Sequence, residues 1–268
     1  MNILVTLNSN YVKPLMVMFK SLFLNNEEES FEIYLMHSSL KEKELEMLRK
    51  FIEDEGQQIH VVTVTNEYFK DAPVVKHYSK EMYYRLLAFK FLPETIDRIL
   101  YLDPDLLILN RIHDLYHTDL SGYLYAAAYH DRGTVKELNK LRLKRYEVDA
   151  YYNSGVMLLN LEEQRKHISE KEIFRFVEEN RKKLILPDQD VINSLYSKKI
   201  KEFDELIYNL DARFYNYHKM VDKIDMDFVI NRTAILHFCG KRKPWLKNYT
   251  GKFHSLYKHY EKLALRFQ

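Results

Sequence analysis

The chain is poor in cysteine, which limits the classes of protein it can belong to. Cys239 is the one cysteine among 268 residues. One cysteine cannot form an intrachain disulfide framework, and it lacks the cysteine partners of a structural zinc site. This sparse use of cysteine fits a reducing compartment, so we expect a cytoplasmic protein.

Glycine is also scarce, and its spacing is wrong for a phosphate-binding loop. The six glycines are Gly56, Gly122, Gly133, Gly155, Gly240 and Gly251. These positions exclude both the Gly-x-Gly-x-x-Gly fingerprint and the P-loop. If this chain binds a diphosphate, it must hold it with a metal ion and cationic side chains instead.

Long apolar runs and an excess of one charge are missing as well. No run reaches the roughly 18 apolar residues of a membrane-spanning helix. The first residues resemble a strand rather than a signal peptide. The 41 basic and 39 acidic side chains give a net charge of +2, which offers no general attraction to nucleic acid. With 46% hydrophobic and 30% charged residues, the composition is that of a globular protein with a substantial core.

What the sequence does contain is an alternation of strand and helix patterns. Strands are predicted at 2–7, 31–37, 59–64, the apolar run before Asp103, 123–129, 152–160 and 234–238, and helices at 11–25, 41–53, 79–91, 169–181 and 188–196. This order predicts an α/β fold with a mostly parallel, mixed sheet flanked by helices. The stretch 200–233 has no clear pattern. We expect one functional domain at 1–245, followed by an extension at 246–268.

Two carboxylates end the central strand of this predicted sheet. Asp103 and Asp105 are separated by Pro104, which stiffens the turn. Open α/β sheets bind ligands at this edge. In extended backbone the two side chains point to the same side, where they repel unless a cation neutralises them. The pattern indicates a metal that grips phosphates, and the alternative is an acidic turn that closes a strand.

Three further motifs lie at the ends of predicted strands or at the start of a predicted helix. Asn153 precedes a second apolar strand, and Asp188-Gln189 lies at a helix start. His237 ends a third strand and is followed by Gly240 and, six residues after the histidine, by a lysine in the run Lys241-Arg242-Lys243-Pro244-Trp245.

Together these motifs resemble the family 8 glycosyltransferases, which are retaining enzymes that include bacterial lipopolysaccharide galactosyl- and glucosyltransferases and glycogenin. The resemblance runs from Asn2 to Trp245, which is nearly the whole chain. Each motif alone is weak, but four in the family's order at compatible separations are specific. The resemblance implies the GT-A type nucleotide-diphospho-sugar transferase fold.

By this resemblance, Asp103, Asp105 and His237 are metal ligands. Two carboxylates with one imidazole suit Mn²⁺ better than Mg²⁺, although Mg²⁺ could also serve. The alternative for His237 is a buried core histidine whose ring is satisfied by hydrogen bonds and binds no metal. Gly240 and Lys243 in register favour the metal site.

The resemblance also assigns nucleotide contacts, which are Thr6, Asn8, Asn10, Tyr11, Arg85, Gly240 and Lys243. Lys243 would reach the diphosphate and Tyr11 would stack on uracil. The family more often has aspartate where Asn8 stands, which places an amide instead of a carboxylate against the base. The alternatives are a helix cap for Asn10, a surface arginine for Arg85 and a solvated lysine for Lys243.

Asn153, Asp188 and Gln189 match the family's residues that contact the donor sugar. A glutamine amide is a feeble nucleophile, so we expect retention by front-face attack, with Gln189 stabilising the transition state. The alternative for Asp188 is a helix N-cap. The family's further acidic position falls at His130 or Asp131.

The C-terminal segment is strongly basic. Residues 241–268 carry eight Lys or Arg against one acid, Glu261. Apolar residues recur there at helical spacing, namely Phe253, Leu256, Tyr257, Tyr260, Leu263, Ala264 and Phe267. Either this helix lies on an anionic membrane that carries a lipid-linked acceptor, or it packs on the protein. The packed arrangement is slightly favoured.

The resulting expectation is a metal-dependent retaining hexosyltransferase. It would move glucose or galactose from a UDP-sugar to a glycan, lipid-linked or protein-linked acceptor, in the cytoplasm or at the inner membrane face. The alternatives are a non-catalytic nucleotide-sugar-binding protein and a self-glycosylating, glycogenin-like protein. Haloacid-dehalogenase-like phosphatases also carry Asp-x-Asp, but theirs follows the first strand and continues Gly-Thr rather than Leu106-Leu107.

Overall fold

The computed structural model describes residues 1–65, 67–70, 72–73, 82–129 and 150–266. Its main sheet has the order β3-β2-β1-β4-β7-β6-β8, and a smaller sheet has the order β5-β10-β9. The strands are β1 (Asn2–Thr6), β2 (Glu32–His37), β3 (Gln58–Thr63), β4 (Arg98–Leu102), β5 (Leu106–Ile108), β6 (Tyr125–Tyr129), β7 (Tyr152–Asn160), β8 (Ile200–Phe203), β9 (Leu210–Asp211) and β10 (Ile235–His237).

Both sheets are mixed. In the main sheet β3, β2, β1 and β4 are mutually parallel, β7 is antiparallel to β4 and β6, and β8 is parallel to β6. In the small sheet β10 pairs antiparallel with β5 and parallel with β9. The predicted α/β class and mostly parallel, mixed sheet are therefore confirmed.

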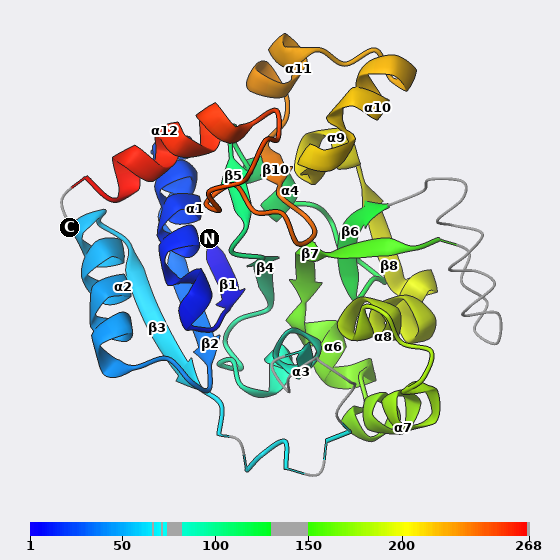
Figure 1. Cartoon of the computed structure of the whole chain (residues 1–268). Helices are drawn as coiled ribbons and strands as arrows, with labels where there is room; N and C mark the ends of the chain where they lie inside the picture. Colours follow the sequence, from blue (N-terminus) through cyan, green and yellow to red (C-terminus); the bar gives the residue numbers. More distant parts are fainter. Residues whose placement is uncertain (66, 71, 74–81, 130–149, 267–268) are drawn as a thin grey trace.

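Helices cover the sheet and join its strands (Figure 1). The α-helices are α1 (Val12–Leu24), α2 (Glu42–Asp54), α3 (Met82–Leu86), α4 (His113–Tyr116), α6 (Leu161–His167), α7 (Glu170–Asn180), α8 (Pro187–Tyr196), α9 (Glu205–Tyr208), α10 (Tyr215–Val221), α11 (Met226–Asn231) and α12 (His254–Ala264). Short 3-10 turns are η1 (Ser9–Tyr11), η2 (Ala88–Lys90), η3 (Ser197–Lys199) and η4 (Ala212–Phe214).

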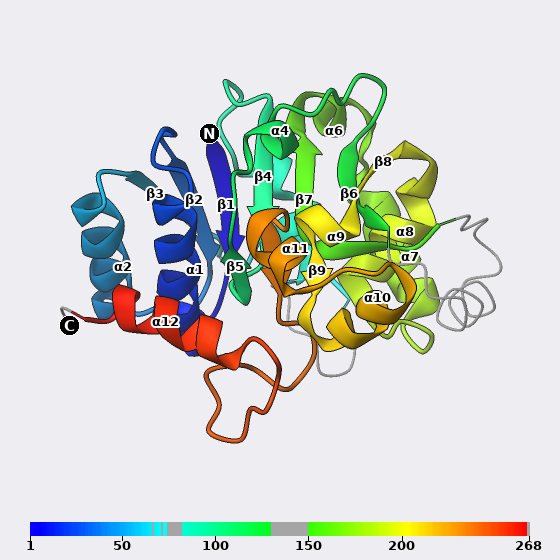
Figure 2. The same cartoon turned by 90° about the horizontal axis from the view of Figure 1, so that it is seen from above.

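The apolar runs that predicted strands form the centre of the core. The side chains of Ile3, Leu100 and Leu158, on β1, β4 and β7, are fully buried. A second apolar cluster joins α12 and α1 to the small sheet, and it includes Val17, Leu107, Leu210, Leu236, Phe253 and Tyr257. Figure 2 shows α12 lying across α1.

The helix predicted at 79–91 is shorter in the structure. Of its described part, 82–86 is α-helical and 88–90 is a 3-10 turn, with Leu87 between them. The stretch 200–233, which had no clear pattern, forms four short helical segments and two short strands. Among the described residues, no helix is both long and apolar enough to cross a bilayer.

Candidate active site

The pairing of β5 with β10 brings the Asp-x-Asp turn and His237 together. Asp105 directly precedes β5, and His237 pairs with Leu106, the first residue of that strand. The backbone N–H of Phe238 donates to the Asp105 carbonyl at 3.0 Å. Two residues that are 132 positions apart in the chain are thus held side by side by backbone hydrogen bonds.

Asp103, Asp105 and His237 form a compact group of donor atoms. One ligand atom from each lies within 4.8 Å of the others. His237 Nε2 is 3.4 Å from Asp105 Oδ1. Two carboxylates and one imidazole are a donor set that suits Mn²⁺. The three residues that resemblance assigned to a metal therefore lie where they could bind one ion.

Gly155 on β7 lies directly against the side chains of this group. A Cβ atom at this position would lie 2.4 Å from His237 Cε1 and 2.7 Å from Asp103 Oδ2. The Gly155 carbonyl accepts a hydrogen bond from the Asp103 backbone N–H at 2.8 Å. The close approach of β7 to the His237 and Asp103 side chains therefore requires glycine, a role that the sequence pattern did not reveal.

Two side-chain amides, one bonded to the other, contact the Nδ1 side of the His237 ring. His237 Nδ1 lies 2.8 Å from Asn209 Oδ1, and Asn209 Nδ2 donates to Asn153 Oδ1 at 2.9 Å. Asn153, a predicted sugar contact, is thereby joined through Asn209 to the group formed by Asp103, Asp105 and His237. Asn209 was not predicted, because it precedes the two-residue strand β9 in a stretch without periodicity.

Arg85 connects Asp103 to Asp188. Its guanidinium lies 3.0 Å from Asp103 Oδ1 and 3.2 Å from Asp188 Oδ2, and it stacks 4.3 Å from the centroid of the Tyr101 ring. The side chain is 15% exposed, so the surface alternative for Arg85 is wrong. The N-cap alternative for Asp188 is also wrong, since Leu186 is the N-cap of α8.

Gln189 is buried and faces β7. Its Oε1 accepts from the Ser154 backbone N–H at 3.2 Å and lies 3.4 Å from the Ser154 hydroxyl. Asp188 Oδ2 accepts from that hydroxyl at 3.1 Å. Ser154 thus holds both residues of the predicted Asp188-Gln189 pair against the strand that carries Asn153.

Lys243 closes the other side of the group. Its ammonium binds Asp105 and donates to the Phe238 carbonyl at 2.9 Å. The side chain is 12% exposed, so the solvated-lysine alternative is wrong. Gly240, at φ +83°, forms the turn that returns Lys243 to the site. Trp245 packs edge-on against Tyr11, with ring centroids 5.7 Å apart.

The N-terminal segment reaches the same edge of the sheet. Thr6 Oγ1 lies 3.2 Å from the Tyr101 hydroxyl, which donates to Asp103 Oδ1 at 2.6 Å. Asn8 is exposed, and its side chain caps the 3-10 turn by accepting from the Asn10 backbone N–H at 3.1 Å. The predicted helix cap at Asn10 is wrong, because Tyr11 occupies that position and makes no side-chain cap.

The two carboxylates differ in acidity. Burial raises the pKa of Asp103, and Arg85 opposes that rise only in part. Burial would also raise the pKa of Asp105, but His237 and Lys243 outweigh it and lower that pKa. Burial would lower the pKa of Lys243, but Asp105 raises it above its ordinary value. A negative charge on Asp105 next to a positive charge on Lys243 is therefore favoured.

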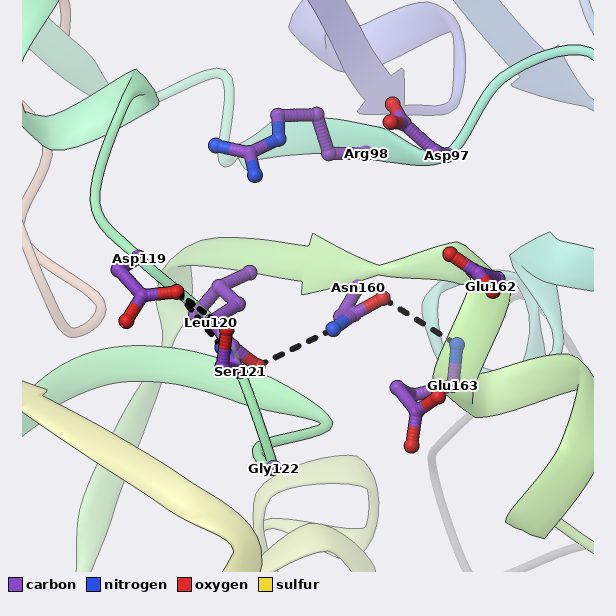
Figure 3. A pocket seen from close by; sticks show the side chains of 9 residues that line it. All are labelled: Asp97, Arg98, Asp119, Leu120, Ser121, Gly122, Asn160, Glu162 and Glu163. Carbon is purple, nitrogen blue, oxygen red and sulfur yellow. Dashed lines mark hydrogen bonds between the residues drawn. The ribbon is translucent and has the colours of Figure 1, made fainter.

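A separate pocket lies at the far end of β4 (Figure 3). It includes Arg98, which begins β4, whereas Asp103 follows the end of that strand. Its polar side chains are used locally, since Asn160 Oδ1 caps α6 by accepting from Glu163 N, and Asp119 Oδ1 accepts from Ser121 N. The pocket belongs to the opposite edge of the sheet from the Asp103 group.

All thirteen residues assigned by resemblance lie in the described part of the chain, and the contacts above join most of them at one edge of the sheet. The roles assigned to them stay predictions. His130 and Asp131 lie outside the described residues.

This fold is that of the GT-A glycosyltransferases. The structure superposes on the galactosyltransferase LgtC, solved in complex with donor and acceptor sugar analogs, with a TM-score of 0.83. The match covers 98% of this chain and 96% of LgtC at 23% identity. The predicted GT-A fold is therefore confirmed.

The sequence comparisons identify the family. The model of glycosyl transferase family 8 matches residues 2–249. General stress protein A of Bacillus subtilis (strain 168) is 27% identical over 97% of this chain and 92% of its own length. Lipopolysaccharide 1,2-glucosyltransferase of Escherichia coli (strain K12) is 27% identical over 92% of this chain and 73% of its own length. The chain belongs to glycosyl transferase family 8, and it is a hexosyltransferase.

Proposed function

We propose that the protein is a metal-dependent, retaining hexosyltransferase that uses UDP-glucose or UDP-galactose. The observation that carries this proposal is the group formed by Asp103, Asp105 and His237, whose possible ligand atoms lie within 4.8 Å of one another. This group lies at the edge of the sheet where open α/β folds in general bind their ligands. We propose Mn²⁺ as the ion, with Mg²⁺ as a weaker substitute. When bound, the ion neutralises charge on the diphosphate leaving group.

The neighbouring residues have roles consistent with this chemistry. Lys243 adds a positive point charge for the diphosphate, and Arg85 orients Asp103 and Asp188 through its two-pronged guanidinium. The uridine is bordered by Thr6, Asn8, Asn10 and Tyr11. Gly240 allows the turn that carries Lys243 to approach the diphosphate. Asn153, Asp188 and Gln189 contact the hexose.

In the proposed reaction the bond between the anomeric carbon and the diphosphate oxygen breaks as the acceptor oxygen bonds to the same face of that carbon. The acceptor proton moves to a diphosphate oxygen, and UDP leaves. Gln189 does not attack in this scheme. The contacts of Gln189 Oε1 with Ser154 support that view, because they hold the oxygen against β7. Proton NMR of the product tests retention, since an α-linked donor must give an α-linked product, and a covalent glycosyl adduct trapped on Gln189 would refute front-face attack.

The first experiment is a donor screen that measures UDP release from a panel of UDP-sugars with Mn²⁺. We expect turnover with UDP-glucose or UDP-galactose and its loss in excess chelator. Asp103→Asn and Asp105→Asn should each lower turnover about 100-fold or more, because a main electrostatic contribution is removed. Asp54→Asn, an exposed residue on α2, is the matched control and should change nothing. Full activity in chelator would refute the metal site.

The acceptor proposed here is a glycan, including one carried on a lipid at the inner membrane face. The apolar face of the C-terminal helix packs on the protein, so support comes only from the exposed basic side chains of this segment, which are Lys241, Arg242, Lys247, Lys252, Lys258, Lys262 and Arg266. Each cation near an anionic bilayer contributes about 1 kcal/mol, screened by salt. Sedimentation with anionic vesicles at low and high salt tests this proposal, and absence of binding at low salt would leave an acceptor in solution.

A self-glycosylating hexosyltransferase is the other candidate. Mass spectrometry after the donor screen separates the two, because a self-glycosylating protein gains the mass of hexose on its own chain.

A further inference from the structure

We infer that Asn209 is a positioning residue that fixes the ring of His237 for metal binding and joins it to Asn153. The inference rests on the metal site proposed above. Asn209 itself is fully buried, so it reaches the bound substrates only through these two neighbours.

The direction of each hydrogen bond in this group follows from one backbone donor. The Gly155 N–H donates to Asn153 Oδ1 at 2.8 Å, so the atom at that position must be an oxygen. The Asn209 atom that faces this oxygen at 2.9 Å must then be the amide nitrogen. The other end of the Asn209 amide, which faces His237 Nδ1 at 2.8 Å, is therefore its oxygen.

This order decides which nitrogen of His237 can bind metal. An amide oxygen only accepts hydrogen bonds, so Nδ1 must carry a proton. In the neutral ring the lone pair is then on Nε2, the atom that lies 3.4 Å from Asp105 Oδ1. Hydrogen bonds of this kind hold metal-binding histidines in one tautomer and one orientation.

The backbone of Asn209 is fixed independently of its side chain. Its N–H donates to the Glu205 carbonyl at 3.0 Å, at the end of α9. The next two residues form β9, which pairs in parallel with β10, so that Asp211 lies beside His237. A change confined to the Asn209 side chain should therefore release the imidazole while leaving the strand pairing in place.

The experiment compares Mn²⁺ binding, measured by EPR in the presence of UDP, in the wild type, Asn209→Ala and Asn209→Asp. Asn26→Ala is the matched control, because Asn26 is also buried and its side chain also makes two hydrogen bonds, to Leu22 and Ile112, away from the site. We expect Asn209→Ala to weaken Mn²⁺ binding about 10- to 100-fold, and Asn26→Ala to leave it unchanged.

Asn209→Asp separates the contact with His237 from the contact with Asn153. It also serves as the second variant if the alanine variant does not fold. A carboxylate still accepts from His237 Nδ1 but cannot donate to Asn153. Mn²⁺ affinity should therefore stay close to that of the wild type, while the KM for the UDP-sugar rises. If Asn209→Ala binds Mn²⁺ as tightly as the wild type and lowers Tm as Asn26→Ala does, then Asn209 only stabilises the fold and the inference is wrong. An unchanged KM in Asn209→Asp would remove the link to Asn153.

A metal-independent readout distinguishes failure of this inference from failure of the metal site. In ¹⁵N-labelled protein without metal, the His237 Nδ1–H should give a protected resonance, assigned by its loss in His237→Gln. Asn209→Asp should retain this signal and Asn209→Ala should lose it. If the wild type binds no Mn²⁺, the metal proposal falls and this resonance still decides the role of Asn209. Its absence from the wild type overturns the inference.

Discussion

Gly155 is the residue at which the site leaves no space for a side chain. Its position on β7 is held by the antiparallel pairing with β4, and Asp103 donates to its carbonyl. The side chains of His237 and Asp103 then occupy the volume above its Cα atom. The positions of the His237 and Asp103 side chains thus depend on the absence of a side chain at Gly155.

Gly155→Ala should disrupt the site more than the fold. The added Cβ would lie 2.4 Å from His237 Cε1, so the imidazole must move, and both Mn²⁺ affinity and UDP release should fall at least about 10-fold. Gly56→Ala is the complementary control. It has no atom within 4 Å of the added Cβ but a φ of +76°, so it should lose about 1 kcal/mol of stability and keep its activity. Equal Mn²⁺ affinities in the two variants would contradict the steric argument.

Sequence reasoning reached some site residues and missed others for a physical reason. Asp103, Asp105 and His237 follow apolar strands, so the pattern of the chain places them at a sheet edge. Asn209 and Gly155 act through contacts with residues far away in the chain, and the residues next to them in the sequence give no signal of those contacts. Asn209 in particular precedes a strand of only two residues, too short to leave a periodic signal.

At the scale of secondary-structure elements, α12 resolves the question left open by its amphipathic sequence. Its Phe253 and Tyr257 side chains are each 2% exposed, and the Tyr260 hydroxyl accepts from Asn25 at the end of α1 at 2.9 Å. The packed arrangement is confirmed for the described residues, although Tyr260 is only partly buried. The division into a catalytic part at 1–245 and an extension at 246–268 stays a prediction.

Phe253→Ala should destabilise the whole protein, because it opens a cavity where α12 meets α10. Phe253 contacts Tyr215 edge-on, with ring centroids 5.3 Å apart. The expected loss is about 3–5 kcal/mol of the free energy of unfolding, measured by urea denaturation. Lys258→Ala on the exposed face of the same helix breaks only a surface ion pair and should change stability by about 0.5 kcal/mol. A loss below about 1 kcal/mol for Phe253→Ala would mean that α12 is not part of the cooperative core.

At the scale of the whole molecule, the fold was more predictable than its details. The central strands β1, β4 and β7 are apolar runs, and burial on both faces of a sheet makes such runs easy to recognise. The small sheet was harder, because β5, β9 and β10 have two or three residues each and depend on pairing between distant segments. The single helix expected at 79–91 is interrupted at Leu87, where the chain changes from α-helical to 3-10 geometry.

UDP should stabilise the folded protein only when a divalent metal is present. The chain has no glycine-rich loop for phosphate, so in the proposed function affinity for the diphosphate depends on the metal site and on Lys243. At a UDP concentration about 100 times Kd, the gain should be about 2.7 kcal/mol. This corresponds to roughly 5–10 °C in Tm for a domain of this size. Thermal shifts that are equal with and without Mn²⁺ would contradict this dependence, and a larger shift with ADP would contradict uridine selectivity.

The pairing of β5 with β10 also has a consequence for how the protein is made. Asp105 leaves the ribosome long before His237, and the small sheet cannot form until the later strand has emerged. A nascent chain therefore carries both carboxylates without the imidazole while the 132 residues from Asp105 to His237 are added. In the proposed function, donor binding requires that β10 has paired with β5, so this ability is acquired only after His237 has been synthesised and not gradually along the chain.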